Sequence, residues 1–253
     1  MENGKGQIKR NDYGVLCTEL YEYLHAEAPR EELEFDLSYA RKGQPILEPL
    51  CGSGRFLVPF LERGFAVQGL DNSPSMLKKL LEKAPDASVV QSGLEEYRTE
   101  ERFDYIFIPS GSVSLFTDLR QCRAALSRIR GLLRDGGRFV FAVDTTASRC
   151  PDREGCGMDA AADLGDGRRL VLRSRRYYDA ATQTQFCPSR YEVYRDGVLM
   201  QREAMDFQTH LYRRGEMEAI LQEIGFSRIR AYASFQKDPA VDTCPEFLYE
   251  CGV

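Results

Sequence analysis

Residues 45–71 read PILEPLCGSGRFLVPFLERGFAVQGLD, and they decide the fold. A short apolar run ends in Glu48, and a turn of small residues follows it. An apolar-periodic segment then closes at Gly64, and a second apolar run ends in Asp71. This order predicts a strand, a glycine turn, a helix and a strand tipped by a carboxylate, which is a βαβ nucleotide-binding unit.

The bulk composition is that of an ordinary soluble globular protein. The chain has 253 residues, of which 43% are hydrophobic and 29% charged, enough for one large domain or for one domain with an insertion. The net charge of -5 gives no long-range attraction to phosphate backbones, which disfavours nucleic acid as a partner. Residues 1–12 lack an apolar signal core, and no run approaches the roughly 20 residues of a membrane helix. We therefore expect a cytoplasmic protein.

The cysteines and histidines do not suggest a metal site. Without a signal peptide, the eight cysteines are expected to be free, buried thiols. Cys150 and Cys156 are six positions apart, too wide for the usual paired zinc ligands, and His25 and His210 are far apart in the chain. We predict that the protein binds no metal.

Strand and helix patterns alternate around the opening stretch. The N-terminal part has helical spacing over residues 11–26 and 30–40, so residues 1–44 are expected to form a helical cap or lid. Strands are expected at 87–90, 103–108, 138–143, 226–235 and 247–251, with helices at 75–84, 119–133 and 214–224 and a turn at 134–137. This alternation predicts an α/β fold, a doubly wound and mostly parallel seven-stranded sheet. Its ligand cleft should lie outside the carboxyl ends of the first and fourth strands.

A different pattern interrupts this alternation after residue 145. Residues 145–167 are small, polar and acidic, and are expected to form a loop. Three alternating stretches follow at 169–178, 185–194 and 198–211, with a hairpin signal at Asp196-Gly197. We predict a small antiparallel β-meander over residues 146–212, inserted between the two parts of a Rossmann-like core at 45–145 and 213–253.

The glycine turn and Asp71 suggest a ligand site. Only glycine lets a backbone approach a ligand without a Cβ clash, and the helix that begins near Gly54 would direct free N–H groups to the same point. The carboxylate of Asp71, 17 residues on, can accept both hydroxyls of a ribose. Alternatively, the glycines only form a turn and Asp71 caps the helix at Pro74. Leu57 stands where a dinucleotide fingerprint needs its third glycine, which disfavours pyrophosphate.

The chain resembles the class I S-adenosylmethionine-dependent methyltransferases. The resemblance rests on four stretches in the family's order over residues 45–144, which read ILEPLCGSGRFLVPFLERGFAVQGLDNSPSML, VVQSGLEEY, FDYIFIPSGSVSLF and LSRIRGLLRDGGRFVFAV. It continues more weakly over 214–253, with LQEIGFSRIRAY. The resemblance implies S-adenosylmethionine as cofactor and methyl transfer to a small-molecule acceptor at nitrogen or oxygen.

The same resemblance implies a set of cofactor-binding residues. Glu48 would steady the loop and the amino group of the ligand, and Asp71 would bind the ribose hydroxyls. The remaining predicted positions are Cys51, Gly52 and Gly54 in the turn, Asn72 and Met76 beside the adenine, Gly93 and Leu94 after the third strand, and Ser110 after the fourth. Two positions depart from the family pattern: Leu50 stands where glycine is usual, and Gly93 where an acid often meets the adenine.

Methyl transfer from a sulfonium needs few catalytic groups from the protein, because the methyl group is already activated. The in-line displacement needs positioning and desolvation of the acceptor, and a base only where the acceptor must lose a proton. Tyr13, Tyr21 and His210 are our candidate catalytic residues beside the cofactor, with His25 and Tyr212 as further candidates. Each of these side chains is also of a type that often has only a structural role.

Three other functions stay open at this point. A non-catalytic protein that binds an S-adenosyl ligand would fit the departures at Leu50 and Gly93. An RNA methyltransferase would fit the basic stretch at 168–176, which on an alternating strand also fits a solvated face. An NAD-linked reductase would share the βαβ unit, although Leu57 counts against it. The meander resembles insertions that small-molecule methyltransferases place over the active site or use to form a homodimer.

Overall fold

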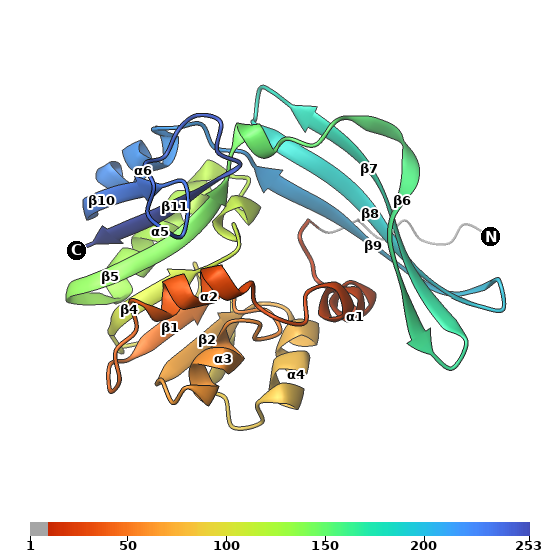
Figure 1. Cartoon of the computed structure of the whole chain (residues 1–253), viewed down its shortest axis with the longest axis horizontal. Coiled ribbons are helices and arrows are strands. Elements are labelled where there is room, and N and C mark those ends of the chain that lie inside the picture. Colours follow the sequence, from red (N-terminus) through yellow and green to blue (C-terminus); the bar gives the residue numbers. More distant parts are fainter. Residues whose placement is uncertain (1–9) are drawn as a thin grey trace.

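The computed structural model describes residues 10–253, and a seven-stranded sheet forms its centre (Figure 1). The strand order is β10-β11-β5-β4-β1-β2-β3. Strands β1 to β5 are parallel, and β11 is antiparallel to both β5 and β10. Their bounds are β1 Ile46–Pro49, β2 Val67–Asp71, β3 Val89–Gln91, β4 Phe103–Ile108, β5 Leu133–Asp144, β10 Ser227–Tyr232 and β11 Glu246–Gly252. The predicted fold class is confirmed, and residues 1–9 of the predicted cap lie outside the described residues.

Helices cover both faces of this sheet (Figure 1). One face carries α5 (Leu119–Leu132) and α6 (Glu216–Ile224). The other carries α2 (Arg30–Leu37), α3 (Leu57–Glu62) and α4 (Pro74–Lys83). The remaining α1 (Val15–Leu24) packs through Leu16 and Leu20 against a second sheet.

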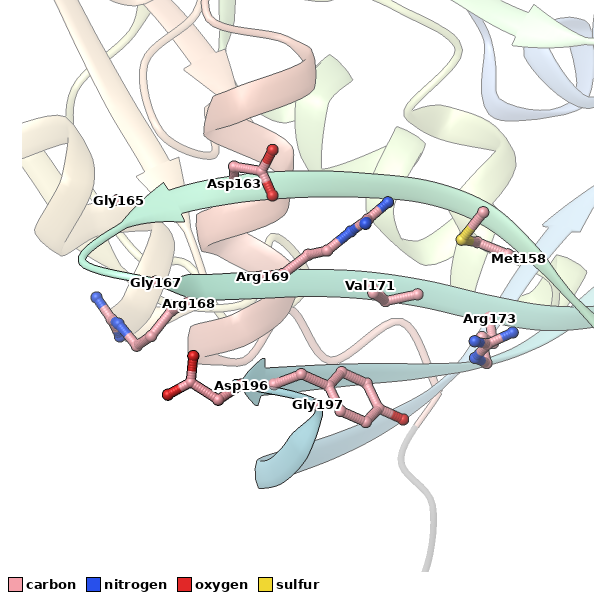
Figure 2. Close-up of a pocket in the computed structure, with 11 residues that line it drawn as sticks. Met158, Asp163, Gly165, Gly167, Arg168, Arg169, Val171, Arg173, Asp196 and Gly197 are labelled. Carbon is pink, nitrogen blue, oxygen red and sulfur yellow. The ribbon is translucent and has the colours of Figure 1, made fainter.

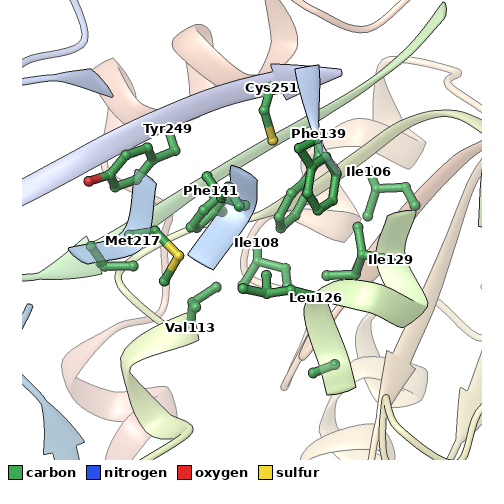
Figure 3. Packing of buried hydrophobic residues seen from close by; sticks show 14 of the residues in the cluster. Ile106, Ile108, Val113, Leu126, Ile129, Phe139, Phe141, Met217, Tyr249 and Cys251 are labelled. Atoms are coloured by element: carbon green, nitrogen blue, oxygen red, sulfur yellow. The ribbon is translucent and has the colours of Figure 1, made fainter. Parts of the chain in front are cut away.

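Strand β4 shows why the central strands are apolar at nearly every position. Ile106 and Ile108 face the cluster under α5 and α6, whereas Tyr105 and Phe107 face the cluster under α2, α3 and α4. Both faces are therefore buried, as its sequence FDYIFI predicts. Figure 3 shows the first cluster, in which the β4 isoleucines meet Phe139 and Phe141 of β5 and Leu126 and Ile129 of α5. The predicted turn at 134–137 lies within β5, where Gly136 has a φ of 76°.

A second, four-stranded sheet lies in sequence between β5 and α6. It is antiparallel in the order β6-β7-β8-β9, with β6 Arg153–Gly165, β7 Arg168–Asp179, β8 Thr184–Arg195 and β9 Val198–His210. The predicted meander is present but has one more strand than expected. Figure 1 shows this sheet curving away from the seven-stranded sheet, and α1 lies on the side of it that faces the seven-stranded sheet.

Strand β6 corrects the prediction of a loop over 145–167. It is an edge strand whose residues are mostly exposed or half-buried, and Ala162 is its one buried residue. Its register with β7 shifts at three places, the first between Arg153 and Gly157. Pairing with β7, rather than an alternating apolar face, therefore holds this segment extended, and small polar residues suffice for that.

The residues just before α1 connect the two sheets. Backbone and side chain of Asn11 bond the β9 backbone, since its N–H donates to the Asp206 carbonyl and its Oδ1 accepts the Gln208 N–H at 2.8 Å. Its Nδ2 also donates to the Leu115 carbonyl beside the seven-stranded sheet, at 3.1 Å. Glu203 of β9 accepts the N–H groups of Leu16 and Cys17 at the start of α1. The N-terminal segment is thus clamped between both sheets.

Three further observations concern residues 10–253 alone. No helix there is long and apolar enough to cross a membrane, and no group of three or more His, Cys, Asp or Glu side chains is arranged to hold a metal ion. The cysteines there are unpaired, as expected. Five of them are buried, but Cys156 is exposed and Cys150 and Cys187 are half-buried, so the expectation of burial is wrong for these three.

Candidate functional site

A cavity of about 510 Å³ opens at the carboxyl ends of the parallel strands. It lies where the sequence places the cleft, at the reversal of strand order between β1 and β4. Its wall includes these predicted cofactor residues: Gly52, Asp71, Asn72, Met76, Gly93, Leu94 and Ser110. The candidates Tyr13, Tyr21 and His25 also line it, whereas Glu48, Cys51, Gly54, His210 and Tyr212 do not.

Asp71 organises the glycine turn as well as facing the cavity. Its Oδ2 accepts the Gly52 N–H at 2.8 Å, and its Oδ1 accepts the Ser73 N–H at 2.8 Å. Ser73 in turn caps α4, since its Oγ accepts the Met76 N–H. Burial raises the pKa of Asp71, and the backbone hydrogen bonds oppose that rise. The alternative that Asp71 caps this helix is therefore wrong, because Ser73 does so, while Asp71 holds the glycine turn and faces the cavity.

The two glycines of the turn have different structural roles. Gly52 has a φ of 53°, and a Cβ there would meet only Met76 Sδ, at 3.9 Å, so this backbone is open to a ligand. Gly54 has a φ of 82°, and a Cβ there would lie 2.8 Å from Leu80 Cγ. Gly54 is thus required for packing against α4 rather than for contact with the cavity.

Leu50 explains why a glycine is expected at its position. Its φ is 59°, the left-handed region, and its side chain lines the cavity. This conformation costs a residue with a Cβ about 1–2 kcal/mol. The turn thus has a left-handed backbone that glycine adopts more easily, and Leu50 adds an isobutyl group to the cavity wall.

The cavity wall that follows β3 contains an acidic side chain, Glu95. Gly93 and Leu94 line the cavity together with Glu95, whose Oε2 lies 3.5 Å from where a Cβ on Gly93 would be. A carboxylate is therefore available two residues beyond the position where the sequence expects one. Asn72 and Met76 line the same cavity.

Glu48 and Cys51 lie beneath the cavity instead of in its wall. Glu48 is 2% exposed, and its Oε2 has no hydrogen-bond partner in the part of the chain that the structure describes. Its pKa is raised well above the usual range by burial and by the nearby acids Asp36 and Asp71. Cys51 is buried in the apolar cluster under α3. Neither side chain lines the cavity.

Aromatic side chains from the N-terminal segment close one side of the cavity. The rings of Tyr13 and Tyr21 meet edge to face with centroids 6.4 Å apart. Arg55, just after the glycine turn, donates to the Tyr21 hydroxyl at 3.4 Å and to Ser110 Oγ at 3.3 Å. Burial raises the pKa of both tyrosines, so their phenols are protonated at neutral pH. They can donate hydrogen bonds but are poor proton acceptors.

His210 lies outside the cavity, which corrects its placement as a candidate catalytic residue. It is 2% exposed, its Nε2 lies 3.0 Å from Glu216 Oε1, and its Nδ1 lies 3.1 Å from the Thr182 carbonyl. Its ring also packs edge-on against Tyr212. These contacts join β9 to the start of α6, which is a structural role.

Several cavity residues were missed from the sequence. They are Arg10, Asn11, Arg55, Ser92, Glu95, Leu115, Phe116, Gln121, Asp144, Phe207 and Thr209. Asp144 ends β5, so the rule that identified Asp71 at the end of β2 applies to it as well. Phe207 and Thr209 come from β9 and carry no local signal, because only the tertiary fold brings them to the cavity.

A larger hollow of about 740 Å³ lies on the four-stranded sheet, and Figure 2 shows its residues around two hairpin turns. It contains three arginines of the basic stretch, and acids pair with two of them. Arg168 pairs with Asp166 at 2.9 Å, and Arg173 lies 3.6 Å from Glu192. This pairing fits a solvated surface better than a phosphate-binding one.

Comparisons with known proteins agree with this geometry. Residues 46–137 match the family described as a methyltransferase domain. A protein of Geobacillus sp. (strain WCH70), provisionally named a methyltransferase, is 30% identical over 136 residues, which are 50% of this chain and 55% of that protein. The chain spans about half the length of the curated relatives it matches.

Two crystal structures show the same fold over nearly the whole chain. An S-adenosylmethionine-dependent methyltransferase from Clostridium acetobutylicum superposes with a TM-score of 0.76 at 13% identity, covering 93% of this chain and 96% of the other. The sugar N-methyltransferase KedS8 from Streptoalloteichus sp. superposes with a TM-score of 0.74 at 18% identity, covering 98% of each. Residues 46–137 thus match a methyltransferase domain, and the chain as a whole has the fold of S-adenosylmethionine-dependent methyltransferases.

Proposed function

We propose that the protein transfers a methyl group from S-adenosylmethionine to nitrogen or oxygen of a small-molecule acceptor by in-line displacement. One observation carries the proposal. A single cavity joins the nucleotide-type wall around Asp71 and Gly52 to a second wall built from the N-terminal segment and β9. The first wall suits a cofactor, and the second leaves room for an acceptor.

The residues of the first wall fit the family's cofactor. Bound there, S-adenosylmethionine supplies a methyl group already activated by the sulfonium. Asp71 would accept the ribose hydroxyls with the lone pairs that its two backbone hydrogen bonds leave free. Gly52 presents backbone without a Cβ, and Met76 and Leu94 offer apolar contacts for a purine.

The second wall would position the acceptor and exclude water. Tyr13 and Tyr21 come from the N-terminal segment, and Phe207 and Thr209 come from β9. The clamp at Asn11 and Glu203 holds the two elements together. Desolvation and orientation are the main requirements of this reaction, and such a roof meets both.

Small molecules are the acceptor class that the surroundings favour. KedS8, whose fold this chain shares, is named a sugar N-methyltransferase. Arg168 and Arg173 of β7 pair with acids, which disfavours a phosphate backbone as their partner. Residues 1–44, 45–145 with 213–253, and 146–212 are our proposed cap, core and inserted subdomain. A homodimer through the meander and a cytoplasmic location also stay predictions.

Calorimetry with S-adenosylhomocysteine, S-adenosylmethionine and NAD tests the proposal. Both adenosyl sulfur ligands should bind and NAD should not. Methyl transfer is then followed as S-adenosylhomocysteine release over a panel of small amines, alcohols and one structured RNA. Failure of both adenosyl ligands to bind would refute the proposal. Binding with no transfer to any acceptor would favour the non-catalytic alternative, and transfer to RNA alone would favour the RNA enzyme.

A further inference from the structure

Asp144 is a carboxylate on the side of the cavity that the cofactor residues leave unused. It ends β5, and in the strand order β4 and β1 lie between it and β2, which ends in Asp71. Its backbone is fixed on both sides, since its N–H donates to Ser114 Oγ at 2.8 Å and its carbonyl accepts the Tyr212 N–H at 2.9 Å. The fold therefore holds this side chain at a set place in the wall.

The carboxylate itself has no hydrogen-bond or ion-pair partner among residues 10–253. The neighbouring turn leaves it this space, because Gly111 has a φ of 66° and a Cβ there would lie 3.1 Å from Asp144 Oδ1. Burial raises the pKa of Asp144 to about 6, so it is ionised at neutral pH. A half-buried, unpaired negative charge is costly, and a cationic ligand would remove that cost.

The other groups around Asp144 leave its charge unpaired. Glu246, its partner on β11, has its pKa raised to about 8 by burial and by the charges of Glu32 and Asp144, so it is mostly protonated at neutral pH. The arginines that line the cavity are engaged elsewhere. Arg55 binds Tyr21 and Ser110, and Arg10 binds Thr117 and Gln121.

We propose that Asp144 binds the amino group of the methyl acceptor, so that the acceptors are small amines rather than alcohols or acids. The proposal rests on the methyl-transfer function above and specifies its substrate class. An amine would bind as an ammonium that donates an N–H to the carboxylate, and loss of one of its other protons to solvent would free the lone pair. The lone pair would then accept the methyl group as the bond from methyl carbon to sulfur breaks, and the product would leave as the methylated ammonium. Leu115, Phe116 and Phe207 line the same cavity and would contact the carbon skeleton of the acceptor.

Matched probes test this proposal by binding alone. The protein is saturated with S-adenosylhomocysteine and titrated calorimetrically at neutral pH with cyclohexylamine and with cyclohexanol, which share a carbon ring. We expect the amine to bind at least about tenfold tighter than the alcohol, because a charge-assisted hydrogen bond replaces a neutral one. In Asp144→Asn the preference should fall below about threefold. Glu246→Gln, which changes the adjacent carboxyl outside the cavity, should keep it.

The outcomes separate this proposal from the one on which it rests. If S-adenosylhomocysteine does not bind, both proposals fall. If it binds and the wild-type protein shows no preference for the amine, only the role of Asp144 is overturned, and this result needs no variant. Retention of the full preference in Asp144→Asn also overturns that role.

Discussion

At the residue scale, the carboxylate of Asp71 both orders the glycine turn and faces the cavity. Asp71→Ala removes the acceptor of the Gly52 and Ser73 N–H groups together with the proposed ribose partner. We expect S-adenosylhomocysteine to bind at least about tenfold more weakly, which is about 1.4 kcal/mol, as measured by calorimetry. Asp118→Ala is the matched control, because it removes a helix-capping aspartate from α5 outside the cavity. An equal loss of affinity in both variants would contradict the proposed role.

Leu50 offers a second test at this scale. Because its φ is 59°, Leu50→Gly should be more stable than Leu50→Ala, by about 1 kcal/mol. This reverses the usual order, in which alanine is the more stable of the two. Urea unfolding of the two variants measures the difference, and comparing them with each other cancels the loss of the leucine side chain. A more stable alanine variant would mean that the backbone leaves the left-handed region.

At the element scale, the approach of α4 to the glycine turn depends on Gly54. Gly54→Ala forces a Cβ to within 2.8 Å of Leu80 Cγ at a φ of 82° and should destabilise the protein by about 2–4 kcal/mol. Gly52→Ala has only its φ of 53° to overcome and should cost about 1 kcal/mol. Urea unfolding compares the two. The double variant Gly54→Ala with Leu80→Ala should lose less free energy of unfolding than the two single variants lose together, because the shorter side chain removes the clash.

The elements also show how far the sequence could predict this structure. Strand β4 was predictable because both its faces are buried, and the end of β2 because a carboxylate follows an apolar run. Strand β6 was not, since pairing with β7 alone holds it and pairing leaves no local pattern. In the site, Asp71 followed from its motif, whereas Phe207 is brought to the cavity only by tertiary folding. Asp144 could have been predicted from the end of its strand.

At the scale of the whole molecule, Glu203 couples the inserted sheet to α1. Its carboxylate accepts the Leu16 N–H at 3.0 Å and the Cys17 N–H at 3.3 Å. Glu203→Ala removes this cap, which should cost about 0.5–2 kcal/mol and speed amide hydrogen exchange throughout α1. Mass spectrometry of exchanged peptides measures the effect. Asp135→Ala, which changes an exposed acid within β5, should leave exchange in α1 unchanged, and protection of α1 in the Glu203 variant would contradict the coupling.

Buried carboxyls give the molecule a pH-dependent stability. Burial raises the pKa of Glu246 from 4.5 to about 8, so the folded protein holds a proton there that the unfolded chain has lost. This contribution is fully present below pH 4.5 and is lost as the pH rises to about 8. Glu246→Gln should therefore match the wild type in mildly acidic buffer and be more stable by about 1–2 kcal/mol in mildly alkaline buffer, allowing for partial exposure. Thermal unfolding across this range checks it, and a constant difference would disprove it.

The chain leaves the seven-stranded core for the four-stranded sheet and re-enters the core at the same place. Asp144, its point of departure, accepts a hydrogen bond from Tyr212, its point of return, and Thr145 forms a bridge with Tyr212. The intervening chain could therefore be exchanged for another of different length without disturbing the order of the central strands. Recombination at this junction would replace the proposed acceptor wall that β9 supplies and leave Asp71 and the glycine turn intact. Exchange of this segment is thus a direct way to change the proposed acceptor specificity.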